Sequence, residues 1–295
     1  MLNGRSPVTS AANWVQGARP RTLGAAVSPV MVGTAAASRY GDIVWWRAGF
    51  CLLLAVALQV GVNYANDYSD GVRGVDTQRR GPVRLTASGL AAPARVKQAA
   101  MLSFAIGGLL GIVLAVAVDW RLVVVGAASI LAAALYSGGP KPYASSGLGE
   151  VMVLVFFGFV ATCGSTYVHL ERVPWLAVGA AVPVGLLACA ILLVNNLRDV
   201  DSDREVGKRT LAVRVGKART RVLYRATIVL SMLAVLALAP TAPGALLALL
   251  AAPLAVPPLR IVASKVDPPS LVEALIGTGR LQLVFSVLLA LGLAL

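Results

Sequence analysis

Long apolar stretches, each about the length of a membrane-spanning helix, dominate the sequence. A helix needs about 20 mostly apolar residues to cross the core of a bilayer. Several of the stretches are separated only by short turns, which is typical of antiparallel neighbouring helices. The nine spans predicted in this way cover residues 22–38, 44–66, 96–117, 121–137, 150–167, 174–197, 222–240, 243–261 and 271–294.

Composition supports a membrane protein and excludes soluble enzyme folds. Of the 295 residues, 58% are hydrophobic and 13% are charged, whereas a soluble domain averages about 45–50% apolar and about 25% charged residues. The apolar stretches leave no room for a second, soluble domain. We therefore expect an all-α, polytopic bundle of about nine transmembrane helices that forms a single domain over residues 1–295.

The charge is unequally distributed along the chain. Lys and Arg number 26 against 13 Asp and Glu, a net charge of +13. Such an excess suggests nucleic acid in a soluble protein, but in a membrane protein it sets topology and attracts anionic lipid or substrate, so we expect no nucleic-acid partner. With the N-terminus in the cytoplasm, 21 of these cations lie in inner segments and four in outer ones. This bias predicts a multi-pass protein of the cell membrane whose two large polar loops are cytoplasmic.

Seven of the thirteen acidic residues lie in those two loops. The first loop, NYANDYSDGVRGVDTQRRGPVRLTASG, begins at Asn63, and the second, NNLRDVDSDREVGKRTLAVRVG, begins at Asn195. Each follows an apolar helix that runs from the outer to the inner side, so both face the same side of the membrane. The acidic residues are Asp67, Asp70 and Asp76 in the first loop and Asp199, Asp201, Asp203 and Glu205 in the second.

The spacing of these residues predicts polar stripes on the helix ends. If each helix continues into its loop, Asn63, Asp67 and Asp70 lie at i, i+4 and i+7 on one face, and Asn66 lies one turn from Asp70. The same argument places the second stripe on residues 195, 199 and 203. Asp201 is turned about 200° away from residue 199 around a helix, so we rank it lower as a ligand.

Oxygen-rich stripes combined with basic residues indicate a site for a metal and a diphosphate. Carboxylate and amide oxygens are hard ligands suited to Mg²⁺, and Arg and Lys bind phosphate oxygens. One mixed-charge loop could equally be solvated surface, but two loops with a matching Asn/Asp layout favour a site. The interleaved cations are Arg73, Arg79, Arg80 and Arg84 in the first loop and Lys208, Arg209 and Arg214 in the second.

These motifs resemble the paired aspartate motifs of the UbiA superfamily of intramembrane aromatic prenyltransferases. The details are most similar to its menaquinone branch, which prenylates 1,4-dihydroxy-2-naphthoate. Similar segments run from one end of the chain to the other. They are Ala18-Arg19-Pro20-Arg21-Thr22-Leu23, Asn66-Asp67-x-x-Asp70 with Asp76, Gly81-Pro82-Val83-Arg84, Asn195-Asn196-x-Arg198-Asp199-x-x-x-Asp203, Gly207-Lys208-Arg209-Thr210-Leu211-Ala212-Val213-Arg214 and Thr278-Gly279-Arg280-Leu281.

The resemblance implies a nine-helix fold with a central cavity that opens to lipid and is capped by the cytoplasmic loops. It implies a polyprenyl diphosphate donor, held through Mg²⁺ by the two motifs, and prenylation of 1,4-dihydroxy-2-naphthoate with loss of CO₂ to give demethylmenaquinone. The catalytic residues would be Asp67, Asp70, Asp199 and Asp203. The metal ligands would be these four with Asn66, Asp76 and Asn196, and the diphosphate would be bound by Arg73, Arg84, Lys141, Lys208 and Arg214.

Polar residues within or beside the apolar spans are candidates for the acceptor. Such groups usually face the bundle interior and are often functional. We expect Arg21, Asn63, Lys141 and Arg280 to bind the acceptor, with Lys141 and Arg280 contacting its carboxylate. For Gln59 and Glu150, hydrogen bonding between helices is an equal alternative.

Three competing functions stay open at this point. The same fold can take another aromatic acceptor, such as 4-hydroxybenzoate, homogentisate or haem. CDP-alcohol phosphotransferases also use Asp-bound metal, but their acids lie within one run, whereas here the second set lies over a hundred residues from the first. A cation transporter would need carboxylates near the middle of the membrane, and we predict none there.

Overall fold

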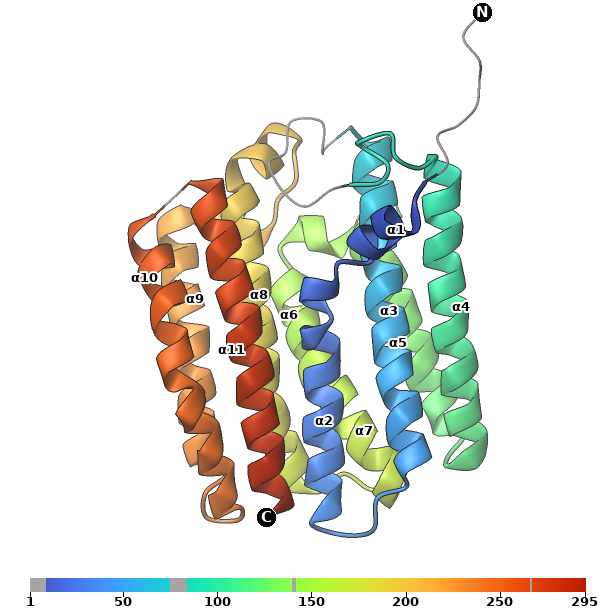
Figure 1. Cartoon of the computed structure of the whole chain (residues 1–295), viewed down its shortest axis with the longest axis vertical. Coiled ribbons are helices and arrows are strands. Elements are labelled where there is room, and N and C mark those ends of the chain that lie inside the picture. Colours follow the sequence, from blue (N-terminus) through green and yellow to red (C-terminus); the bar gives the residue numbers. More distant parts are fainter. Residues whose placement is uncertain (1–8, 75–83, 140–141, 266) are drawn as a thin grey trace, which may run out of the picture.

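The chain folds into one bundle of roughly parallel and antiparallel helices (Figure 1). The computed structural model describes residues 9–74, 84–139, 142–265 and 267–295, and within these ranges it contains no β-strand. The α-helices are α1 (Ala11–Ala18), α2 (Gly24–Ser38), α3 (Trp45–Val72), α4 (Pro93–Ala117), α5 (Arg121–Ser137), α6 (Gly149–Val153), α7 (Ala161–Leu170), α8 (Trp175–Glu205), α9 (Leu211–Leu236), α10 (Val256–Ser264) and α11 (Pro268–Ala294). Four 3₁₀ or π segments complete the set: η1 (Pro20–Thr22), η2 (Tyr143–Ser146), η3 (Leu154–Val160) and η4 (Pro243–Ala255).

The nine predicted spans all fall on helical segments. The span predicted at 150–167 consists of α6, the π segment η3 and α7, and the span at 243–261 consists of η4 and α10. Six helical segments of the described chain are long and apolar enough to cross a membrane, while α2 and α5 are shorter apolar helices. The count of nine is therefore approximate, and the chain is a multi-pass membrane protein.

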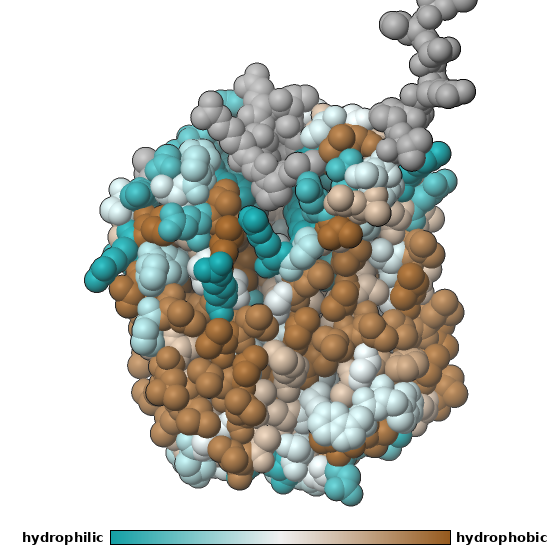
Figure 2. Space-filling model, in the orientation of Figure 1, coloured by the Kyte–Doolittle hydropathy of each residue, from teal (hydrophilic) through white to brown (hydrophobic). Residues whose placement is uncertain are grey.

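The face of the bundle seen in Figure 2 is apolar over most of its height, as the brown colour shows. Side chains such as Leu109 on α4, 65% exposed, and Val116, 85% exposed, point outward. A soluble protein rarely exposes large continuous apolar patches, so this belt is the surface that meets lipid. Most of the strongly hydrophilic side chains on this face gather at the end of the bundle where α3 and α8 end.

Helix α8 lies at the centre of the packing. Two thirds of its most apolar stretch is buried, mainly against α9, α11, η3 and α2. Small residues bring the backbones close: a Cβ atom on Gly33 of α2 would overlap the carbonyl oxygen of Thr162, and one on Gly292 of α11 would overlap that of Gly244. Close approach at small residues is typical of helix packing in membranes.

Both acid-bearing helices extend beyond their apolar stretches. Helix α3 continues to Val72 and α8 to Glu205, so the first residues of each acidic loop are helical, as the sequence predicts. The two helices end on the same side of the bundle (Figure 1), which confirms the prediction that both loops face one side.

Candidate active site at one end of the bundle

The two acidic motifs line one cavity. Its walls are formed by the ends of α3 and α8, by the start of α6, and by the segments around residues 19, 84, 137, 145 and 208. The lining residues are Arg19, Asn66, Asp70, Arg73, Arg84, Tyr136, Ser137, Ala144, Ser145, Gly149, Asn195, Asn196, Asp199, Asp203, Lys208 and Thr210.

On α3, the stripe that faces this cavity is Asn66, Asp70 and Arg73, at i, i+4 and i+7. The side-chain oxygen of Asn66 is buried and has no hydrogen-bond partner among the described residues. Arg73 donates a hydrogen bond to the carbonyl of Gly139 at 2.8 Å. An unpaired buried acceptor beside a buried carboxylate is a place where a cation is favourable.

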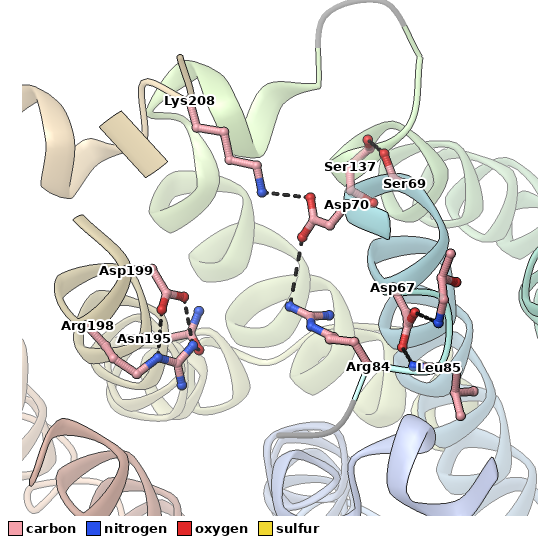
Figure 3. Close-up of polar contacts among 11 residues, drawn as sticks. Asp67, Ser69, Asp70, Arg84, Leu85, Ser137, Asn195, Arg198, Asp199 and Lys208 are labelled. Atoms are coloured by element: carbon pink, nitrogen blue, oxygen red, sulfur yellow. Dashed lines mark hydrogen bonds and ion pairs between the residues drawn. The ribbon is translucent and has the colours of Figure 1, made fainter. Parts of the chain in front are cut away.

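Asp67 differs from its predicted role as a metal ligand. One carboxylate oxygen accepts the backbone N–H of Leu85 at 2.7 Å, the other accepts that of Thr86 at 2.9 Å, and Asp67 does not line the cavity. Figure 3 shows its side chain directed toward Leu85, away from Asp70. The returning loop needs acceptors for these two N–H groups, and Asp67 supplies both. In this structure Asp67 therefore anchors the loop.

On α8, the predicted stripe of Asn195, Asp199 and Asp203 faces the cavity, together with Asn196. Asp201 points elsewhere: it is exposed and pairs with Lys217 at 2.6 Å. The helical periodicity ranked Asp201 lower as a ligand, and in the structure its side chain lies outside the cavity. The oxygen ligands of α8 and those of α3 line the same space.

Cations already pair with two of the cavity carboxylates (Figure 3). Asp70 receives Lys208 Nζ at 2.7 Å on one oxygen and Arg84 at 3.8 Å on the other. Asp199 is held by Arg198 through two contacts of 2.7 Å. Arg198 also donates to Asn195 at 3.0 Å. Two cavity carboxylates are therefore neutralised by cations, and two of these cations, Lys208 and Arg84, also line the cavity.

The predicted diphosphate ligands divide into two groups. Arg73, Arg84 and Lys208 line the acidic cavity. Arg214 does not. It lines an adjoining basic cavity with Arg204, Lys208 and Arg209, and its Nε donates to the carbonyl of residue 209 at 3.1 Å. Lys141, like the predicted metal ligand Asp76, lies outside the described residues.

Of the predicted acceptor ligands, the three that lie within the described residues are not brought to the cavity. Asn63 donates to the carbonyl of Ala18 at 2.8 Å and to the Thr22 hydroxyl at 3.2 Å, so it joins α3 to the segment that follows α1. Arg21 and Arg280 are exposed. None of the three lines the cavity, because their helix faces point toward neighbouring segments or outward.

Two arginines of the site are absent from the predicted set. Arg19 lines the cavity and has a left-handed backbone conformation, φ 54°, at the end of α1. Arg198 has only 2% of its side chain exposed beside Asp199. The position of Arg198 directly before an aspartate of the motif was a usable signal. The position of Arg19 depends on how α1 folds over α3.

The donor set fits Mg²⁺. Within the described ranges, no three His, Cys, Asp or Glu side chains are gathered closely enough to hold a metal ion by themselves. Mg²⁺ usually binds through only one or two carboxylates and keeps waters and substrate phosphates as its other ligands. The carboxylates of Asp70, Asp199 and Asp203 and the unpaired oxygen of Asn66 suit that requirement.

Comparisons with known proteins agree with this architecture. The chain is 47% identical to a 1,4-dihydroxy-2-naphthoate octaprenyltransferase of Mycobacterium tuberculosis, over 97% of this chain and 98% of that protein. It is 36% identical to a protein of the same name from Escherichia coli, over 95% and 94% of the two chains.

Solved structures share the fold. A UbiA homologue from Archaeoglobus fulgidus bound to GPP and Mg²⁺ superposes with a TM-score of 0.64 at 13% identity, over 94% of this chain and 99% of that one. The apo structure of a homologue from Aeropyrum pernix K1 gives 0.66 at 17% identity, over 93% and 97%. The model of the UbiA prenyltransferase family matches residues 26–276. The chain therefore belongs to the UbiA prenyltransferase family.

Proposed function

We propose that this protein transfers a polyprenyl group from polyprenyl diphosphate to 1,4-dihydroxy-2-naphthoate with loss of CO₂, giving demethylmenaquinone in its quinol form. The observation that carries the proposal is the single cavity in which oxygen ligands of α3 and α8 lie among phosphate-binding cations. The acceptor is inferred from the full-length similarity to proteins named 1,4-dihydroxy-2-naphthoate octaprenyltransferase.

In this proposal the oxygen atoms of Asn66, Asp70, Asn196, Asp199 and Asp203 would hold Mg²⁺ ions, each ion through one or two of the carboxylates together with phosphate oxygens. When bound, Mg²⁺ neutralises the charge of the diphosphate and makes it a better leaving group. The cations Arg73, Arg84 and Lys208 hold the phosphate oxygens. Lys208 and Arg84 pair with Asp70 in the structure and can exchange that carboxylate for phosphate.

The reaction needs no protein nucleophile. The allylic C–O bond breaks, diphosphate leaves, and the electron-rich ring forms the new C–C bond at its carboxyl-bearing carbon. The carboxylate then leaves as CO₂, and the electrons of its C–C bond restore the aromatic ring. The contribution of the protein is to neutralise the leaving group and to orient the two substrates.

The membrane location follows from the donor. Each CH₂ buried in lipid gains about 0.8 kcal/mol, so a polyprenyl tail stays in the bilayer while its diphosphate stays at the interface. The charge bias along the sequence supports a cytoplasmic position for the acidic cavity in the cell membrane.

An assay with the purified protein tests the proposal. We expect product from an allylic diphosphate and 1,4-dihydroxy-2-naphthoate with Mg²⁺, a product mass that reflects the loss of CO₂, and no product after chelation with EDTA. Parallel reactions with 4-hydroxybenzoate and homogentisate serve as controls for the acceptor. Product from either of these, and none from the naphthoate, would show that the acceptor is wrong. Full activity in EDTA would contradict the metal role.

A further inference from the structure

Glu150 is a buried carboxylate beside the acidic cavity that has no part in the mechanism above. It lies in the first turn of α6 and is 8% exposed. One carboxylate oxygen accepts a hydrogen bond from Nδ2 of Asn196 at 3.0 Å. The other oxygen is buried and has no hydrogen-bond partner in the described part of the chain.

The contact between α6 and α8 is fixed at a second point. The Sγ atom of Cys189, about two turns before Asn196 on α8, donates to the backbone carbonyl of Glu150 at 3.1 Å. A hydrogen bond between helices does not by itself require a carboxylate at this position, because a glutamine makes the same bond without burying a charge. Hydrogen bonding between the helices therefore does not explain why position 150 carries a carboxylate.

A carboxylate at position 150 can select which end of the Asn196 amide faces the cavity. An asparagine presents to a cation either its oxygen, which binds it, or its NH₂ group, which does not. In the structure Glu150 accepts a hydrogen bond from the NH₂ group of Asn196, and an acceptor at this position holds that end of the amide toward α6. The oxygen of Asn196 is then the end left for the cavity that this residue lines.

We propose that Glu150 is a positioning residue that holds the amide of Asn196 with its oxygen toward the cation of the active site. This inference rests on the proposed function, because it concerns the cation that the acidic cavity would hold. Groups that orient a metal ligand in this way typically contribute a factor of about 10–100 to metal affinity.

The test measures metal binding directly, without catalysis. Mn²⁺ replaces Mg²⁺ as the probe, inorganic diphosphate is present, and free Mn²⁺ is compared by electron paramagnetic resonance with and without the purified protein. We expect Glu150→Gln to raise the dissociation constant for Mn²⁺ about 10-fold, because a glutamine can donate as well as accept and no longer selects one end of the amide. The matched control is Glu205→Gln, which removes an exposed acid from the same end of α8 and should leave the constant within about twofold.

A double variant separates positioning from simple packing. In Glu150→Gln with Asn196→Asp, the glutamine donates to one carboxylate oxygen and the other faces the cavity, so affinity for Mn²⁺ should return to within about threefold of the wild type. If Glu150→Gln does not fold, Asn196→Ala beside the intact Glu150 provides the second measurement, with the same expected loss.

The outcomes distinguish this inference from the proposed function. If the wild-type protein binds Mn²⁺ and Glu150→Gln binds it equally well, the positioning role is wrong while the metal site stands. Unchanged affinity in Asn196→Ala overturns it in the same way. If the wild-type protein binds no Mn²⁺ with diphosphate, both the metal role and the positioning role fail.

Discussion

Asp67 and Asp199 have the same side chain at corresponding places in the two acidic loops, but their surroundings differ. Asp67 accepts two backbone N–H groups of the returning loop, whereas Asp199 faces the cavity and is paired with Arg198. Helical spacing predicted the stripe on α8. On α3 it allowed two stripes, one through Asp67 and one through Asn66, because both include Asp70. The choice depends on how α3 is rotated about its axis, which only the packing determines.

This difference predicts separable effects of the same substitution. Asp199→Asn should reduce prenyl transfer at least about 100-fold and raise the Mg²⁺ concentration needed for half-maximal activity. Asp67→Asn should instead lower stability by about 1.5–3 kcal/mol, the contribution of hydrogen bonds to a charged group. Its residual activity should respond to Mg²⁺ as the wild type does.

Activity against Mg²⁺ concentration and unfolding temperature in detergent measure the two effects. Asp201→Asn is the matched control, since that carboxylate is exposed and bound to Lys217, and neither quantity should change. If Asp67→Asn raises the Mg²⁺ concentration needed for half-maximal activity as much as Asp199→Asn does, Asp67 is a metal ligand.

At the scale of helices, the sequence predicted the elements well and their contacts poorly. The apolar lengths located all nine spans, because the bilayer requires a fixed number of apolar residues per crossing. They gave no sign that α8 occupies the centre or that α1 folds over α3, where the Tyr64 hydroxyl donates to the Trp14 carbonyl at 2.8 Å. In an apolar chain every face is hydrophobic, so the pattern that marks the inner face of a soluble helix is missing.

The crossing of η4 and α11 gives a prediction at this scale. Gly292→Ala places a Cβ atom against the carbonyl of Gly244, and the two backbones must separate. We expect a loss of about 1–3 kcal/mol, as for other overpacked sites, measured as a lower unfolding temperature in detergent. Gly126→Ala on α5, where no atom lies within 4 Å of the added Cβ, is the control and should be neutral or slightly stabilising. Equal stability of the two variants would mean that the backbones of η4 and α11 have room for the added Cβ atom at this crossing.

At the scale of the whole molecule, the ends of α3 and α8 that line the acidic cavity lie at one end of the bundle, and the turn after α7 lies at the other (Figure 1). The charge distribution predicts that the cavity end is cytoplasmic. The three native cysteines lie within α3, α7 and α8, so new cysteines can report orientation.

Labelling of introduced cysteines measures this orientation. A membrane-impermeant maleimide should label Glu171→Cys, an exposed position after α7, in intact cells. It should label Glu205→Cys, an exposed position at the end of α8, only after the cells are opened. The unaltered protein is the background control. The reverse pattern would place the cavity on the outer side.

The ion pairs of the cavity have a consequence for the resting protein. Carboxylates crowded at the rim of an apolar bundle would repel one another, but Asp70 and Asp199 each have a basic partner contributed by the chain itself. These cations therefore neutralise the two carboxylates from within the protein. If the protein binds a diphosphate as proposed, Lys208 and Arg84 must release Asp70 to bind the phosphate oxygens, so binding exchanges one set of ion pairs for another.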